Sequence, residues 1–211
     1  MPQISRHEFE RLPLRVHDFL AGVPLHDAWA IDLPRTHSGI TLHEFLRTTS
    51  VRSQVSCGCC ENDRSSKRSL LTRSPVVRTL LNIRFFVGRL LGWDREPAST
   101  AWETFTTRLT TADRSKSLVP AGTREGLFRI VYHFEDEQLL ELINRTAHAA
   151  ALSALVETAN AYRFYFGVYV QNVSRFTPVY LALVDPFRKL IVYPSLLRTV
   201  RGSWNQAFGT D

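Results

Sequence analysis

The longest amphipathic pattern in the chain covers residues 178–201. Apolar side chains recur there at steps of three and four, which places them in one stripe along a helix. Charged residues at 185, 188 and 189 interrupt the run, so it lacks the roughly 20 consecutive apolar residues of a membrane-spanning helix. The pattern predicts a long C-terminal helix that lies on a sheet through a stripe formed by Tyr180, Leu183, Val184, Phe187, Leu190, Ile191 and Leu197.

Alternating apolar and polar residues upstream predict the strands of that sheet. Residues 25–33 alternate in this way and place Asp27 on the apolar side. Residues 127–135 alternate cleanly, and Phe128, Ile130, Tyr132 and Phe134 are expected to face one way.

The strands expected to follow complete an antiparallel meander. Residues 162–171 are rich in aromatic and β-branched side chains, and 138–145 is the other expected strand. Residues 148–158 are compatible with a helix, because of their alanines, or with a strand, because the alternate set that starts at His148 carries no charge. A long helix lying across such a meander predicts an α+β fold.

Three helices are expected before the meander. Residues 7–20 suit a short helix that Pro13 weakens, and Thr41 with Glu44 forms a capping-box signature. Residues 75–94 form a stronger pattern, in which Arg84 lies among apolar side chains. Such an arginine extends to solvent along its stem or binds an internal carboxylate or anionic ligand.

The segment 50–74 is rich in Ser, Arg and Cys and has little periodicity, so it is expected to be a flexible insertion. All three cysteines lie in it, at Cys57, Cys59 and Cys60, which excludes a disulfide framework. The three thiolates are weak candidates for a metal site, because a tetrahedral site needs a fourth ligand and only His43 and Glu61 lie close in sequence. We expect loop cysteines and no metal, with redox sensing as the alternative.

Composition favours a single globular domain over residues 1–211, since no linker divides the chain. The net charge of +6 comes from scattered arginines and permits weak attraction to anions, but basic residues are concentrated only over 64–78, without interleaved aromatics. Nucleic-acid binding is therefore not expected. The N-terminus is too charged for a signal peptide, which predicts a cytoplasmic protein without a membrane span.

Residues 80–94 (LLNIRFFVGRLLGWD) and 184–198 (VDPFRKLIVYPSLLR) resemble the two most recognisable stretches of an uncharacterised bacterial domain family. That family is often C-terminal to NAD(P)-binding, short-chain-dehydrogenase-like domains and is grouped with the START/SRPBCC-like helix-grip proteins. The resemblance implies such a core over residues 20–200, with an antiparallel sheet wrapped around the C-terminal helix. It also implies an internal cavity and an NAD(P)-dependent reductase-type partner. This chain has Pro186-Phe187-Arg188 where family members commonly carry Pro-Phe-His, so no role of that histidine is carried over. It has no GxGxxG motif, so a nicotinamide cofactor is not supported and no cofactor is expected.

Four polar residues are expected to point toward the interior: Asp27, Arg84, Tyr132 and His148. Asp27 beside His148 could act as a general base, and Arg84 could hold an anionic oxygen. The alternative is a structural Asp27–Arg84 ion pair with His148 bonded to backbone. The residues expected to bind a ligand are Arg84, Tyr132, Phe164, Phe166, Tyr180 and Phe187.

Three functions follow from these expectations. The first is binding of a hydrophobic, aromatic or lipid-like small molecule in an internal cavity. The second is a cofactor-independent cyclase, dehydratase or isomerase that uses the same cavity. The third is an interaction module that binds through the basic insertion. Hydrolases of familiar type are not expected, because the sequence contains no GxSxG or HExxH motif.

Overall fold

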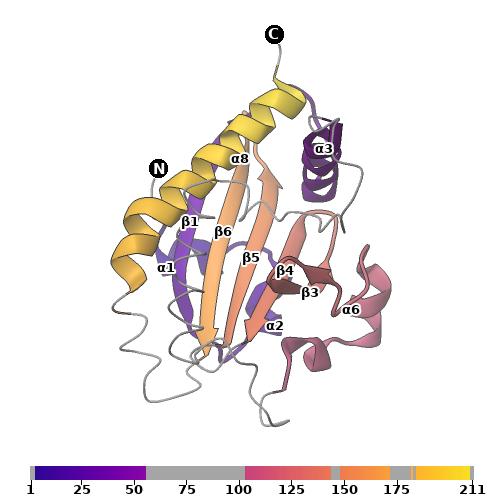
Figure 1. The fold of residues 1–211 in the computed structure, drawn as a ribbon, viewed down its shortest axis with the longest axis vertical. Helices are drawn as coiled ribbons and strands as arrows, with labels where there is room; N and C mark the ends of the chain where they lie inside the picture. The colour runs from indigo at the N-terminus through magenta and orange to yellow at the C-terminus, as the bar shows by residue number, and fades with distance from the viewer. Residues whose placement is uncertain (1–2, 56–102, 144–147, 172–181, 183, 210–211) are drawn as a thin grey trace.

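The computed structural model describes residues 3–55, 103–143, 148–171, 182 and 184–209. Six strands form one antiparallel sheet in the order β1-β6-β5-β4-β3-β2 (Figure 1). The sheet, together with a long C-terminal helix, confirms the α+β class. The strands are β1 (Leu25–Pro34), β2 (Arg124–Glu125), β3 (Phe128–His133), β4 (Glu137–Ile143), β5 (His148–Glu157) and β6 (Ala161–Gln171).

The expected strands are confirmed, and the ambiguous segment at 148–158 is a strand. Its first residue, His148, pairs with Gln171 on β6 and with Ile143 on β4, so β5 is paired along both of its edges. Hydrogen bonding on both edges outweighs the helix propensity of its alanines, whose small side chains fit the buried surface.

A β-bulge in β3 changes the predicted facing of Tyr132. The pairing register with β4 shifts between Ile130 and Tyr132. The extra residue reverses the alternation, so Ile130 and Tyr132 lie in the apolar layers on opposite faces of the sheet. The expectation that both residues face one way is wrong for this reason.

Two short helices precede β1, and the others before the C-terminal segment lie between β1 and β2. Pro13 separates the first two, and the capping interaction expected from Thr41 is present, since its Oγ1 accepts from the Glu44 backbone N–H at 3.2 Å. The third helix extends to Val55, so the first residues of the expected flexible insertion are helical. The helices are α1 (Arg6–Glu10), α2 (Arg15–Phe19), α3 (Leu42–Val55), the 3-10 turn η1 (Phe105–Arg108) and α6 (Thr111–Lys116).

One face of the sheet, which we call the front layer, is covered by the C-terminal helix α8 (Tyr193–Phe208) and by α3 (Figure 1). The back layer, on the other face, contains apolar residues of α1, α2 and η1. Gly167 on β6 lies directly under Phe9 of α1, where an added Cβ would come within 2.8 Å of the ring. A glycine is therefore needed here for close approach of the aromatic ring.

Residues 184–208 are continuously helical, and the wide turn η2 (Arg188–Val192) precedes α8. Pro194 offers no backbone N–H and would clash with the Leu190 carbonyl in a regular turn, which gives a physical reason for the wider one.

The predicted stripe is wrong for the first half of this helical segment. Phe187, Leu190 and Ile191 are 54%, 77% and 36% exposed. The buried side chains come later and are Tyr193, Leu196, Leu197, Val200 and Trp204. Among the described residues, no helix is long and apolar enough to cross a membrane.

Candidate functional site

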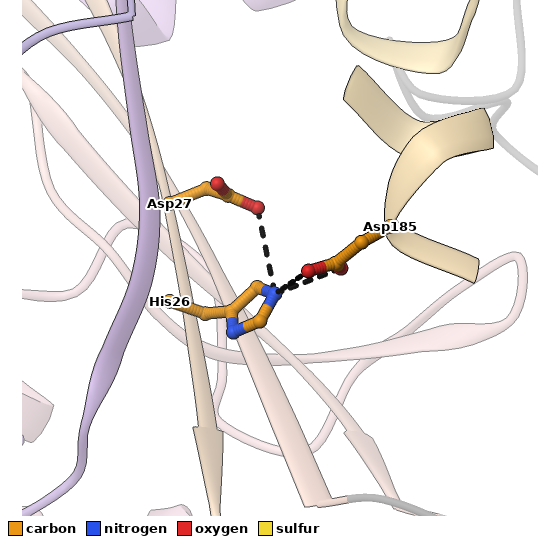
Figure 2. Close-up of side chains that lie close together, drawn as sticks. All are labelled: His26, Asp27 and Asp185. Atoms are coloured by element: carbon orange, nitrogen blue, oxygen red, sulfur yellow. Dashed lines mark hydrogen bonds and ion pairs between the residues drawn. The ribbon is translucent and has the colours of Figure 1, made fainter. Parts of the chain in front are cut away.

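A bulge in β1 turns two adjacent polar residues toward the C-terminal helical segment. The register between β1 and β6 shifts between Leu25 and Asp27. At a bulge, neighbouring side chains can share a face instead of alternating. Figure 2 shows the result, in which the His26 imidazole lies between Asp27 and Asp185 of the helix and contacts both.

Asp27 is a buried carboxylate with long contacts. Its side chain is 0% exposed. The Tyr193 hydroxyl donates to Oδ2 at 3.2 Å, and the Gln3 side-chain amide donates to Oδ1 at 3.4 Å. An ionised carboxylate can accept about four hydrogen bonds, and burial makes each missing one costly. The two hydrogen bonds of Asp27 are therefore long, and its other neighbours are the charged groups described next.

Two basic side chains of the helix neutralise the acidic residues of this site. Arg188 lies 3.6 Å from Asp27 Oδ2 and 3.2 Å from Asp185 Oδ1. Lys189 Nζ lies 3.7 Å from Asp27 Oδ1 and 4.0 Å from Asp185 Oδ2. Asp185, Arg188 and Lys189 are three and four residues apart, so they lie on one side of the helix. In most helices this spacing buries apolar residues; in this one it turns charged residues toward the sheet.

His26 is bound mainly to Asp185. Its Nε2 lies 2.8 and 2.9 Å from the two oxygens of that carboxylate and 3.7 Å from Asp27 Oδ2. The imidazole and the Asp185 carboxylate are about one-fifth exposed, whereas Asp27 is fully covered. The site is thus open to solvent on the His26 side and closed at Asp27.

Tyr193 joins the ionic part of the site to the apolar front layer. Burial raises the pKa of its phenol well above the usual value, and the nearby positive charge of Arg188 offsets only part of that rise. The hydroxyl therefore stays protonated and donates to Asp27, while Arg188 donates to the same hydroxyl oxygen. The Tyr193 ring lies 5.3 Å from Trp29 and 5.8 Å from Phe166, measured between ring centroids.

Trp29 has a buried donor without a partner. It lies two residues after Asp27 on β1, is 8% exposed, and contacts the Tyr193 ring. Its indole Nε1–H finds no acceptor in the part of the chain that the structure describes. Buried polar groups are rarely left unpaired, so this donor, two residues along the strand from Asp27, is unusual.

His26, Asp27 and Asp185 are also the residues that could hold a metal ion, since one ligand atom from each lies within 4.8 Å of the others. Imidazole and carboxylate groups are suitable ligands for zinc and related ions. Arg188 and Lys189 already balance the two carboxylate charges. A divalent ion would have to displace these cations, so the charge balance disfavours a metal here.

His148 lies away from Asp27 and has another partner. Its Nε2 is 2.7 Å from Glu141 Oε1, and both side chains are 1% exposed. The His148 ring stacks on Phe105 of the back layer at a centroid distance of 3.9 Å. Glu141 also accepts from the Phe105 backbone N–H at 2.6 Å. The structure therefore does not bring His148 together with Asp27.

Tyr132 also belongs to the back layer. Its hydroxyl donates to Glu137, whose carboxylate accepts from the backbone N–H groups of Arg15 and Val16 at 2.8 and 3.0 Å. Burial raises the pKa of Glu137, while these hydrogen bonds oppose the rise. In these contacts Tyr132 helps to attach α2 to the sheet.

The other expected site residues divide into three groups. Phe164 and Phe166 lie in the front layer with Tyr193, as a ligand-binding role would require. Phe187 is exposed on the outer side of the helix. Arg84, Tyr180 and the cysteines Cys57, Cys59 and Cys60 lie outside the described residues.

Sequence reasoning missed His26, Trp29, Asp185, Arg188 and Tyr193 as parts of this site. One signal was available, because Asp185, Arg188 and Lys189 interrupt an apolar helix at helical spacing. The bulge that adds His26 has no comparable sequence signal.

An antiparallel sheet with a polar cluster between its first strand and a long C-terminal helix defines the class of this protein as an α+β domain. The chain belongs to the family described as "Protein of unknown function (DUF2867)", which matches residues 19–195. No curated protein and no solved structure matches the chain.

Proposed function

We propose that this protein binds a hydrophobic small molecule in the front layer, next to Asp27. The observation that carries the proposal is the buried Trp29 N–H, which has no acceptor among the described residues, on the same strand as the buried Asp27 carboxylate, whose hydrogen bonds are long. A ligand with both an acceptor and a donor, such as a carbonyl and a hydroxyl group, would satisfy both. Ligand sites are typically apolar with a few such polar groups.

The surroundings supply the apolar part of this site. Phe164, Phe166 and Tyr193 line the same layer, and their rings favour an aromatic or lipid-like molecule. The protonated Tyr193 hydroxyl holds Asp27 at the boundary between this layer and the charged cluster. Two of the ligand-binding residues expected from sequence, Phe164 and Phe166, therefore remain in the proposal together with Asp27.

Native mass spectrometry of the purified protein, compared with the spectrum after denaturation, tests this function. A bound organic molecule is expected in the wild type but not in Trp29→Phe. Trp204→Phe is the control and should keep the ligand, because the Trp204 indole donates to the Pro34 carbonyl and not to the ligand. If no ligand copurifies, a library of hydroxylated aromatic compounds is screened by the rise in melting temperature. Equal shifts for wild type and Trp29→Phe, or no shift with any compound, would contradict the proposal.

A second candidate is a cofactor-independent enzyme, a cyclase, dehydratase or isomerase, that abstracts a proton in the same place. The favouring observation is the His26–Asp185 pair, because a carboxylate that orients an imidazole is a common arrangement for a general base. Here His26 takes the role first expected of His148. The test is deuterium incorporation from D2O into a bound carbonyl compound, expected for wild type and absent in His26→Gln. Exchange that persists at the wild-type rate in His26→Gln would exclude this role.

The interaction module based on residues 52–78 falls largely outside the described residues and is a separate proposal. It predicts binding to an acidic partner that weakens steeply with salt. The reductase-type partner implied by the family resemblance is likewise a proposal, to be tested by copurification with an NAD(P)-dependent protein.

A further inference from the structure

The outer face of the C-terminal helical segment reverses the usual pattern of a surface helix. Asp185, Arg188 and Lys189 are turned toward β1, whereas Leu190 and its neighbours are exposed, as described above. A helix normally buries its apolar side and exposes its charges. A row of large apolar residues on the outside marks a surface that contacts something else.

The charged residues on the exposed side of α8 are basic. Arg198 and Arg201 are exposed on α8, on the side away from its buried residues. Between Pro186 and Gly209 the sequence contains no Asp or Glu, and two of its four basic residues, Arg188 and Lys189, pair with Asp27 and Asp185 instead. The chain as a whole has a net charge of +6. The face therefore joins apolar side chains to a positive field and is complementary to a negatively charged surface.

We infer that this face, formed by Phe187, Leu190, Ile191, Arg198 and Arg201, docks on the surface of an anionic lipid bilayer. Apolar side chains would enter the boundary between headgroups and acyl chains, and the arginines would contact anionic headgroups. The helix would lie along the membrane with its other side still on the sheet.

A bilayer fits this face better than a folded protein does. Stable protein interfaces bury about 800 Å² on each partner over some 20 residues, whereas the apolar part here is three side chains on one convex helix. Acyl chains require no matching shape, so a few projecting residues suffice when charge supports them. This inference is separate from small-molecule binding and does not depend on it.

Sedimentation with vesicles tests the inference. We expect the protein to sediment with phosphatidylcholine vesicles containing about one-third phosphatidylserine, and to do so less as salt is raised. Phosphatidylcholine alone should bind it weakly. Leu190→Asp should lower the partition coefficient about tenfold or more, and Arg198→Glu by a comparable factor.

Matched controls come from other exposed residues. Leu118 and Leu127 are 47% and 46% exposed on other parts of the chain, so Leu118→Asp and Leu127→Asp should leave vesicle binding unchanged. Because Leu190 is 77% exposed, Leu190→Asp should fold normally, which circular dichroism checks.

Three results would overturn the inference. The first is no sedimentation with anionic vesicles. The second is equal loss in Leu190→Asp and Leu127→Asp, which would indicate general electrostatic adsorption. The third is a wild-type dimer in analytical ultracentrifugation that Leu190→Asp dissociates, which would assign the face to a second copy of this chain.

Discussion

The two halves of the C-terminal helical segment meet the sheet in opposite ways. In the charged half, residues 184–192, ion pairs face β1 and Leu190 is exposed. In the packed half, α8, apolar side chains such as Leu197 and Trp204 are fully buried, and Arg198 faces solvent. One helical segment is thus held by charges at one end and by apolar burial at the other.

This difference separates stability from recognition. Apolar burial is non-directional and grows with the area covered, so the packed half should supply most of the helix's contribution to folding. A buried ion pair adds little net stability but is costly to break. Under-bonded polar groups lie next to the charged half, and we expect specific binding there.

The largest effect expected is loss of the Trp204 side chain, which anchors the packed half. Trp204→Ala should lower the free energy of unfolding by about 4 kcal/mol, because it leaves a large cavity. Leu190→Ala in the charged half should change it by less than about 0.5 kcal/mol. Urea unfolding followed by circular dichroism measures both. Similar losses for the two variants would remove the contrast between the halves.

Removing the buried carboxylate should be the next most costly change. Asp27→Ala leaves Arg188 without one of its anionic partners and should lower the free energy of unfolding by about 3 kcal/mol. Asp27→Asn should cost less, since its amide oxygen still accepts from Tyr193. The control is Asp32→Ala on the same strand, where the ion pair to Arg163 is exposed and should contribute under about 1 kcal/mol. If Asp27→Ala and Asp32→Ala lower the free energy of unfolding equally, the buried carboxylate of Asp27 is not needed to hold the charged half on the sheet.

Acid should weaken the attachment of α3, which contacts the packed half. His43 on α3 and His133 on β3 form a hydrogen bond of 3.1 Å, and His133 Nδ1 accepts from Gln138. Burial, with a smaller effect from His43, lowers the pKa of His133 from 6.5 to about 4. The unfolded chain therefore binds more protons between these values, and stability falls as the pH drops through that window, by at most about 3 kcal/mol.

Unfolding measured from pH 7 to pH 4 tests this effect, with His133→Asn as the variant that lacks it. The Asp113 carboxylate titrates in a separate window, because the hydrogen bond from Arg15 lowers its pKa to about 2. A folded-state pKa depressed in this way contributes stability that is lost only at lower pH. A pH dependence that is unchanged in His133→Asn would contradict the prediction.

The smallest expected effects come from a comparison of two buried tryptophans. Trp204 Nε1 donates to the Pro34 carbonyl at 2.9 Å, whereas Trp29 Nε1 has no acceptor among the described residues. Trp204→Phe should cost about 1–2 kcal/mol because it leaves that carbonyl unpaired. Trp29→Phe also shrinks a buried ring, but it removes an unpaired donor, so in the ligand-free protein it should cost less than Trp204→Phe. Thermal unfolding of both variants measures the difference, and a larger loss for Trp29→Phe would remove the main support for the binding site.

Much of the fold could be predicted from sequence, because strands have a short and regular repeat. The alternation over residues 25–33 and the aromatic content of 162–171 identified β1 and β6, and Asp27 was correctly expected on the apolar side. The helix-grip arrangement inferred from the family resemblance remains an expectation. The candidate site was harder, since only Asp27, Phe164 and Phe166 of its expected members lie in the front layer.

Local irregularities explain why the rest could not be predicted. A one-residue bulge in β3 moves Tyr132 to the back layer, and another in β1 brings His26 beside Asp27. Such bulges reverse the facing of every residue beyond them, yet they leave no clear mark in the hydrophobic pattern. His148 found a carboxylate partner in Glu141, on a neighbouring strand, which periodicity alone does not reveal.

The sequence by itself determined that strands alternate, that a helix forms near the C-terminus, and that both could bury apolar surface. The tertiary structure decided which side of that helix faces the sheet. Regular helical spacing places Leu190 and Leu197, seven residues apart, on one face, but in the structure Leu190 is exposed and Leu197 is buried. The wide turn at Arg188–Val192 and the anchoring of Arg188 by Asp27 made the choice, because a buried carboxylate requires nearby cations and apolar side chains tolerate solvent at lower cost.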